Sequence, residues 1–173
     1  MKADKLKPDN TDEVHAYIGI GSNLEDPLAQ VTSACDALNT LPKSRVIQIS
    51  HWYGSNAIGP GDQPDYVNGV AQLSTCLSPI ELLDALQNIE HQHGRVRLQR
   101  WGARTLDLDI LLYGDHTIDL PRLSIPHPQL DKRNFVVFPL FDIAPKLVLP
   151  NGEPLNTLTS ELTLCGLWKL DQH

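Results

Sequence analysis

Residues 104–114 read RTLDLDILLYG, an apolar run that carries two carboxylates at alternate positions. A strand places residues i and i+2 on the same face, so Asp107 and Asp109 stand side by side, roughly 7 Å apart at their Cα atoms. Two like charges this close together need a cation between them. The run therefore predicts a strand with one apolar face against a core and a carboxylate pair on the other face.

Arginines gather around this strand, although the chain has a net charge of −7. Six of its seven arginines lie between positions 95 and 133, and four of these lie in the ten residues 95–104. Guanidinium groups bind phosphate oxygens in pairs and remain charged, which suits a polyphosphate. Carboxylates beside arginines therefore indicate Mg²⁺ beside phosphate, and the alternative is a set of paired salt bridges between the two kinds of side chain.

The composition favours one domain. A chain of 173 residues, 41% of them hydrophobic, can bury one core but not two. Its acidic balance argues against a nucleic-acid partner, and no apolar run is long enough to span a membrane. Three widely spaced cysteines without zinc-site spacing indicate reduced core thiols in a cytoplasmic protein. We expect residues 1–13 to be a disordered tail and residues 14–173 to form a single domain.

Hydrophobic periodicity predicts alternating strands and helices along most of the chain. Strands show a period of two, and helices show apolar residues three and four apart. The second helix also has a capping box, because Ser78 precedes Pro79 and Glu81. The expected elements are a strand over 14–21, a helix over 27–41, strands over 45–53 and 66–75, a helix from 79 to a stop at Gly94, and a strand over 105–113.

The order βαββαβ predicts a ferredoxin-like antiparallel sheet with both helices on one face. In that topology the first strand lies between the third and the fourth. Gly19 would then separate the carboxylates from Tyr66 and Asn68 on the outer face, leaving a floor for a flat ligand. A hairpin over 116–125 and a helix over 129–141 should cover part of that face, which gives a three-layer α/β/α domain of the α+β class.

Known nucleotide-binding loops do not account for the phosphate chemistry. The segment GIGSNL has Leu24 where a dinucleotide-binding fingerprint needs its third glycine, and no P-loop sequence occurs. His127 is more often a structural loop residue than a ligand, yet it lies in the arginine-rich region and could contact phosphate. No side chain stands out as a general base.

The chain resembles the 6-hydroxymethyl-7,8-dihydropterin pyrophosphokinase family of folate biosynthesis from about Ala16 to Pro145, in the segments YIGIGSNL, DQPDYVNGVAQL, ELLDALQNIEHQHGRVR, RWGARTLDLDILLYG and IPHPQLDKRNFVVFPLFDIAP. The resemblance implies transfer of the β,γ-pyrophosphoryl group of ATP, the co-substrate, to the pterin hydroxymethyl group, with release of AMP. Another Mg²⁺-dependent kinase or nucleotidyltransferase acting on a small heteroaromatic alcohol is the alternative. A non-catalytic ferredoxin-like sensor domain is a third possibility. We expect a monomer whose partners are small molecules.

The resemblance also implies roles for individual residues. Asp107 and Asp109 match acids that hold two Mg²⁺ ions bridging the ATP phosphates. Arg95 and Arg104 match arginines of catalytic loops, which neutralise charge as the phosphoryl bond breaks. The ATP contacts implied by position are Gln87, Glu90, Arg97, Arg104, Ile110, Arg122, Ser124, His127 and Arg133.

The pterin contacts implied by the resemblance combine stacking with edge recognition. Tyr66 and Phe135 match the aromatic rings that enclose the pterin, since a flat π-system favours stacking. Asn68 matches an amide that pairs with the pterin edge through a donor and an acceptor. The remaining pterin contacts are Ser55 and Ile58 in a recognition loop and Trp101 in a lid.

Overall fold

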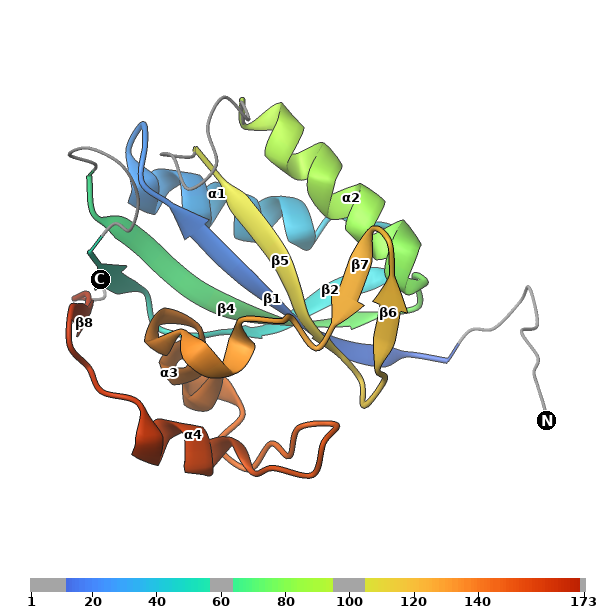
Figure 1. Ribbon diagram of the computed structural model, residues 1–173. Helices are drawn as coiled ribbons and strands as arrows, with labels where there is room; N and C mark the ends of the chain where they lie inside the picture. Colours follow the sequence, from blue (N-terminus) through green and yellow to red (C-terminus); the bar gives the residue numbers. More distant parts are fainter. Residues whose placement is uncertain (1–11, 57–63, 95–104, 172–173) are drawn as a thin grey trace.

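The computed structural model describes residues 12–56, 64–94 and 105–171, and these form a mixed α+β architecture (Figure 1). Its centre is a six-stranded sheet in the order β5-β1-β4-β3-β8, in which β2 also pairs with β4. All of the strand pairs in this sheet are antiparallel. The predicted disordered tail falls almost entirely outside the described residues, which begin at Asp12.

The central strand is β1 (Val14–Ser22), which lies between β4 (Tyr66–Thr75) and β5 (Asp107–Tyr113). The expected placement of the first strand between the third and fourth predicted strands is therefore confirmed. The predicted bounds of these three strands are also confirmed to within two residues. β1 pairs with β4 along its whole length and with β5 along most of it, so its side chains have fixed positions relative to both strands.

Two helices cover one face of the sheet (Figure 1). They are α1 (Pro27–Leu38) and α2 (Pro79–Gln92), and the predicted capping box at the start of α2 is present. The core between these helices and the sheet contains Leu106, Leu108 and Ile110, as the alternation predicts. Their alternating neighbours Asp107 and Asp109 consequently face the other side.

The opposite face packs against α3 (Asn134–Ile143) and α4 (Leu155–Glu161), with a second core cluster between them and the sheet. The prediction of one helix over 129–141 is wrong at its start. A short 3₁₀ turn, η1 (Leu130–Lys132), is followed by an extended Arg133 with φ −113° and ψ 110°, and α3 begins only after it. Because an extended residue cannot continue a helix, Arg133 separates the two helical segments.

The predicted strand over 45–53 is also wrong in extent, because it divides into β2 (Ser44–Ile49) and β3 (Tyr53–Ser55). Both segments pair with β4, but between them the Ser50 hydroxyl, rather than a carbonyl, accepts the Val70 backbone N–H at 2.9 Å. That side-chain bond replaces a ladder bond and ends β2. The expected hairpin is present as β6 (Ile118–Leu120) and β7 (Leu123–Ile125).

The chain after α3 contains two elements that periodicity did not predict, α4 and the short strand β8 (Leu167–Lys169). Of the three cysteines, Cys35 is a core residue as predicted, and burial raises the pKa of its thiol to about 12. Cys165 is exposed, so the prediction of a core thiol is wrong there, because it lies in the chain between α4 and β8. Within the described ranges, no helix combines the length and apolar character needed to cross a membrane.

Candidate active site

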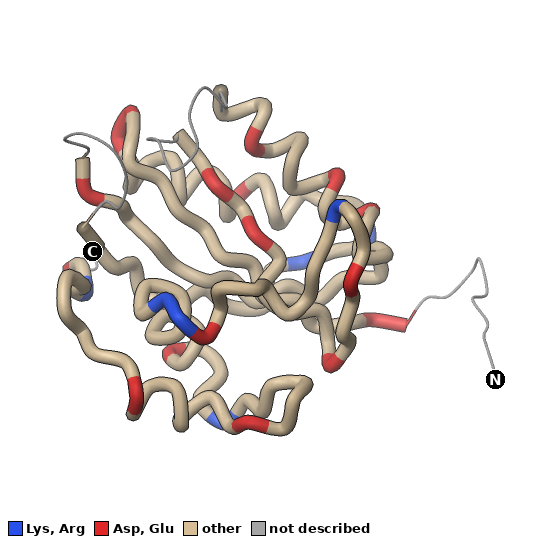
Figure 2. Tube along the Cα trace, viewed as in Figure 1, with Lys and Arg blue, Asp and Glu red and all other residues tan. Residues whose placement is uncertain are grey.

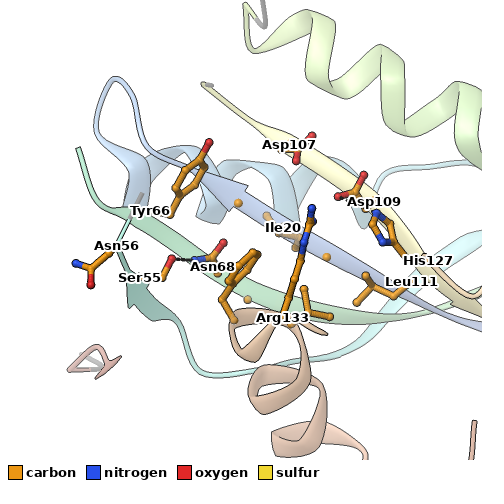
Figure 3. A pocket seen from close by; sticks show the side chains of 15 residues that line it. Ile20, Ser55, Asn56, Tyr66, Asn68, Asp107, Asp109, Leu111, His127 and Arg133 are labelled. Atoms are coloured by element: carbon orange, nitrogen blue, oxygen red, sulfur yellow. Dashed lines mark hydrogen bonds and ion pairs between the residues drawn. The ribbon is translucent and has the colours of Figure 1, made fainter. Parts of the chain in front are cut away.

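A pocket of about 310 Å³ opens on the outer face of the sheet (Figure 3). This volume falls within the roughly 300–1,000 Å³ typical of small-molecule sites. The walls come from β1, β3, β4, β5, the segment after β7 and the start of α3. The predicted site residues that the structure brings together here are Ser55, Tyr66, Asn68, Asp107, Asp109, His127, Arg133 and Phe135.

Glycines of β1 form the floor of the pocket. Gly21 is paired with Asn68 of β4 on one side and with Asp107 of β5 on the other, and Gly19 is paired with Asp109. A Cβ atom at Gly21 would lie 3.0 Å from Asn68 Oδ1, which is tighter than an ordinary van der Waals contact. A bare backbone at this position therefore leaves the Asn68 amide in place and keeps the floor flat between the two sides.

One side of this floor is anionic. Asp107 and Asp109 project from β5 into the pocket, as Figure 3 shows, and the Asp109 side chain is 38% exposed. In the part of the chain that the structure describes, no cluster of three or more His, Cys, Asp or Glu could hold a metal ion. Two carboxylates do suit Mg²⁺, which keeps water and binds through one or two carboxylates together with substrate phosphates.

The strand that carries the carboxylates is held by α2. Glu90 of α2 is 4% exposed, and its carboxylate accepts the Leu108 backbone N–H at 2.7 Å. Leu108 lies between the two aspartates, and β5 is at the end of the sheet order. The structure thus places Glu90 behind the pocket, where it satisfies an edge-strand donor, and not among the residues that line the pocket.

His127 lies beside the carboxylates, with its Nε2 3.9 Å from Asp109 Oδ2. Its Nδ1 accepts the Gln129 backbone N–H at 3.0 Å, which places the proton of the neutral ring on Nε2. Burial lowers the pKa of His127, and the positive charge of Arg133 lowers it further, although Asp107 opposes them. The ring is therefore neutral near pH 7 and offers an N–H donor to the pocket.

The start of α3 supplies the pocket with a cation and an aromatic ring. The Arg133 guanidinium lies over the Phe135 ring, 5.6 Å from its centroid. Figure 2 shows basic positions just before α3 and acidic positions along β5. The arrangement places positive charge opposite the carboxylates, in a position to bind an anion lying between them.

The other side of the floor is a polar and aromatic wall. Asn68 and Ser55 are 6% and 5% exposed, and the Asn68 Nδ2 donates to the Ser55 hydroxyl at 2.7 Å. This bond fixes the amide beside Tyr66 (Figure 3). A rigid amide next to a tyrosine ring can recognise the edge and the face of a flat heterocycle.

Several predicted nucleotide contacts lie in the described structure but outside this pocket. Arg122, in the turn between β6 and β7, donates to Asp84 at 2.6 Å and to Gln87 at 3.2 Å, so these residues form a separate polar group between the hairpin and α2. Ser124 lies in β7, and the Ile110 side chain is 3% exposed in the core, which leaves only its backbone available. The predicted residues outside the described ranges are Ile58, Arg95, Arg97, Trp101 and Arg104.

Sequence reasoning missed some residues that line the pocket. Leu111 shares its face of β5 with the aspartates, so the same period of two could have identified it. Gly21 could have been found in the same way from Gly19. No periodic pattern in the sequence marks the pairing of β3 with β8 or the start of α3. The other missed residues are Ile20, Asn56, Gly69 and Val136.

Comparison with solved structures supports the fold. The chain is similar to wild-type Plasmodium falciparum HPPK-DHPS with pteroate, with a TM-score of 0.69 at 14% identity, over 90% of this chain and 43% of that chain. The chain therefore spans less than half the length of that solved chain. At this identity, the likeness concerns the fold alone.

Comparison of sequences supports the family. Residues 17–145 match the family described as 7,8-dihydro-6-hydroxymethylpterin-pyrophosphokinase (HPPK). The chain is 51% identical over 154 residues to the 2-amino-4-hydroxy-6-hydroxymethyldihydropteridine pyrophosphokinase of Pseudomonas aeruginosa, covering 89% of this chain and 95% of that protein. It is also 51% identical over 158 residues to the protein of the same name from Haemophilus influenzae, covering 91% and 99%. With its β5 carboxylates and aromatic wall in a single pocket, the chain belongs to the HPPK family.

Proposed function

We propose that this protein transfers the pyrophosphoryl group of ATP to 6-hydroxymethyl-7,8-dihydropterin, giving AMP and the pterin diphosphate in folate biosynthesis. The observation that carries the proposal is the two-sided pocket. A glycine floor joins an aromatic and amide wall on β3 and β4 to a carboxylate pair on β5. The relatives named as pyrophosphokinases of this pterin match along most of the chain and support the same activity.

The pocket suggests how each substrate lies. The pterin occupies the wall of Tyr66, Asn68 and Phe135, where a ring can stack and its edge can pair with the amide. The ATP phosphates extend toward the β5 carboxylates, with the His127 Nε2–H and the Arg133 guanidinium as donors. This orientation brings the pterin hydroxymethyl group to the phosphate chain.

The reaction is an in-line displacement. The hydroxymethyl oxygen attacks the β-phosphorus of ATP, and the bond from that phosphorus to the α,β-bridging oxygen breaks. AMP leaves with the bridging oxygen, and the hydroxyl proton is released. Positioning and charge neutralisation supply the catalysis, since phosphoryl transfer needs little covalent help from the protein.

Asp107 and Asp109 are the residues that would hold Mg²⁺, and we propose two ions. When bound, these ions neutralise phosphate charge and polarise the attacking hydroxyl group. Because the described residues of the pocket offer only two carboxylates for a metal ion, we expect Mg²⁺ to bind firmly only together with ATP. Glu90, Gln87, Ile110, Arg122 and Ser124 remain proposed nucleotide-side residues, together with Arg95, Arg97 and Arg104. Ser55, Ile58 and Trp101 remain proposed residues of the pterin side.

Product identification tests the proposal. The protein is incubated with ATP, Mg²⁺ and 6-hydroxymethyl-7,8-dihydropterin, and the products are separated by anion exchange. We expect AMP and pterin diphosphate in equal amounts. ADP with a pterin monophosphate would indicate an ordinary kinase, and free pyrophosphate with an adenylylated pterin would indicate a nucleotidyltransferase. No consumption of ATP would favour a non-catalytic domain.

We further propose that residues 14–173 act as a single domain of the ferredoxin-like class, elaborated into three layers. The two core clusters on opposite faces of one sheet support this assignment. We also propose a monomer in the cytoplasm without a nucleic-acid partner, and the net charge of −7 supports the absence of that partner. Sedimentation of the purified protein at micromolar concentration tests the monomer.

A further inference from the structure

The C-terminal chain after α4 lies beyond residues 17–145, which match the family, yet it pairs with β3, which supplies Ser55 to the pocket. In Figure 1 it leaves α4, passes α3 and ends as β8 next to β3. We name residues 163–170 the C-terminal strap. The strap contacts β3 and α3, and both supply pocket residues. These are Ser55 and Asn56 on the β3 side and Arg133 and Phe135 on the α3 side.

Backbone pairing joins the strap to the β3 side. β8 pairs with β3 so that Ser55 lies opposite Leu167, and the Asn56 backbone N–H donates to the Gly166 carbonyl at 3.1 Å. The Trp168 ring lies against Gly54, where an added Cβ would approach it to 2.4 Å. These contacts continue the sheet by one strand next to the pocket wall.

The Asn134 side chain joins the strap to the α3 side. Asn134 lies between the pocket residues Arg133 and Phe135, and its Nδ2 donates to the Thr163 carbonyl at 2.9 Å and to the Cys165 carbonyl at 3.1 Å. Both amide protons of Asn134 are thereby used. The strap is thus connected, over a few residues, to the first turn of α3 and to the end of β3.

The other end of α3 has its own connection to β3. The Tyr53 hydroxyl donates to the Asp142 carboxylate at 2.8 Å, near the C-terminal end of the helix. That bond positions the far end of α3, whereas the Asn134 bonds act at the end that carries Arg133 and Phe135. Hydrogen bonds at both ends of α3 therefore add to the core packing that holds this helix against the sheet.

We propose that the C-terminal strap fixes the separation of the two pocket walls at the pterin end, so that Asn134 is a positioning residue for pterin affinity. The inference rests on the proposed function, since it assumes that the pterin binds between these walls. A flat ligand enclosed between two walls gains full contact only at one separation, because dispersion attraction falls steeply with distance. The strap should therefore affect the pterin more than ATP, whose phosphates lie toward β5.

The test compares two variants of Asn134 with a matched control. Asn134→Ala removes both donors, and Asn134→Asp also places a carboxylate against two carbonyl oxygens. Leu164→Ala is the control, because this side chain lies in the same strap and is 57% exposed. We expect Asn134→Ala to raise the KM for the pterin about tenfold, the equivalent of two ordinary hydrogen bonds. The kcat should stay within about twofold of wild type, since the lost binding is shared by the ground state and the transition state. The KM for ATP should rise less than the KM for the pterin, since Arg133 is only one of the proposed phosphate donors.

Two further measurements separate the strap from general instability and from the proposed function. Amide exchange at Asn56 should accelerate in Asn134→Ala, because its N–H bonds to the strap, while exchange at Ile18 in the central strand should not change. Calorimetric titration with 6-hydroxymethylpterin measures pterin binding without turnover. An unchanged pterin affinity in both Asn134 variants, or an equal loss of pterin affinity in Leu164→Ala, would overturn the proposed role of the strap. Neither result would bear on the proposed reaction. Wild-type protein that binds the pterin but forms no AMP would instead refute the proposed function.

Discussion

Asp107 and Asp109 alternate along β5 with the core residues Leu108 and Ile110. The same strand therefore contributes to the core on one face and to the pocket on the other. Leu108 and Ile110 are 4% and 3% exposed against the helices, while the aspartates face the pocket. Any slip of β5 by one residue would bury both carboxylates and expose both apolar side chains. The packing of the core thereby fixes the direction in which the carboxylates point.

Neutralising either carboxylate tests its part in the reaction. We expect Asp107→Asn and Asp109→Asn to lower kcat by several orders of magnitude, because the charge that holds Mg²⁺ is lost. The fold should remain, since Asp109 is 38% exposed and asparagine has nearly the same shape. Rapid-quench turnover and circular dichroism measure the two effects. Near-normal turnover in either variant would contradict metal binding at this pair.

The floor glycine offers a second test at a single residue. In Gly21→Ala the new Cβ lies 3.0 Å from Asn68 Oδ1, so the amide must shift away from the pterin edge. We expect the KM for the pterin to rise about 10-fold to 100-fold, the equivalent of roughly 1.4–2.8 kcal/mol. The affinity for ATP, measured by titration, should change little. A variant that lost ATP affinity and kept its pterin affinity would show that the floor has been assigned to the wrong substrate.

At this scale, sequence reasoning identified the residues whose signal is local. A period of two placed both aspartates, Tyr66 and Asn68 on the outer face, and the structure confirms that placement. The family resemblance supplied the role of Phe135, which a local pattern alone would have assigned to the core. The arginine-rich region indicated His127 as a possible phosphate contact, and the resemblance then implied the same role. Asn134 could not be identified, because its partners lie about 30 residues away in an irregular segment.

Among the elements, the contact of α2 with β5 deserves a test of its own. Glu90→Ala leaves the Leu108 N–H without this acceptor, and we expect a loss of about 1–3 kcal/mol in the free energy of unfolding. It should also raise the Mg²⁺ concentration needed for half-maximal rate, because Leu108 lies between the two aspartates. Glu90→Gln keeps an acceptor oxygen, so it should change the free energy of unfolding and the Mg²⁺ requirement less than Glu90→Ala does. If the two variants had equal effects, the charge of Glu90 would matter more than its bond to β5.

The bond between β3 and α3 predicts a pH dependence. Burial raises the pKa of Tyr53, and the hydrogen bond to Asp142 raises it further. An unfolded tyrosine ionises near pH 10 whereas Tyr53 keeps its proton when folded, so its contribution is full below pH 10 and is lost as the pH rises above 10. We expect the destabilisation by Tyr53→Phe, about 1–2 kcal/mol at pH 8, to shrink between pH 10 and pH 11.

Urea unfolding at several pH values measures this difference. Val137→Ala serves as the control, because it removes buried apolar contacts without a titrating group. Its destabilisation should be the same at each pH. A Tyr53→Phe effect that stayed constant across the same range would contradict a proton-dependent contribution from this hydroxyl.

The elements that sequence reasoning predicted correctly are those with a long periodic pattern, such as β1, β4 and α2. It failed where tertiary contacts set the boundary. The Ser50 bond divides β2 from β3, and the extended Arg133 delays α3. β8 is three residues long and exists through its pairing with β3, so no local pattern could reveal it.

In the whole molecule, helices cover both faces of the sheet (Figure 1). The pocket lies on the outer face, and β1 contributes to its lining. Simple topology rules predict how the four expected strands are ordered in the sheet. The structure agrees that the first of them, β1, lies between β4 and β5. The route of the chain after α3 depends on contacts between distant segments, which one sequence does not encode locally. We propose that this route fixes the separation of the two pocket walls at the pterin end.

Binding of metal by the β5 carboxylates, together with ATP, can be tested directly with Mn²⁺ in place of Mg²⁺. Crystals grown with Mn²⁺ and a non-hydrolysable ATP analogue are measured near the manganese absorption edge. The account predicts anomalous peaks about 2.0–2.3 Å from carboxylate oxygens of Asp107 and Asp109 and from phosphate oxygens. Bound nucleotide without such peaks, or with both aspartates bonded only to arginine, would contradict it.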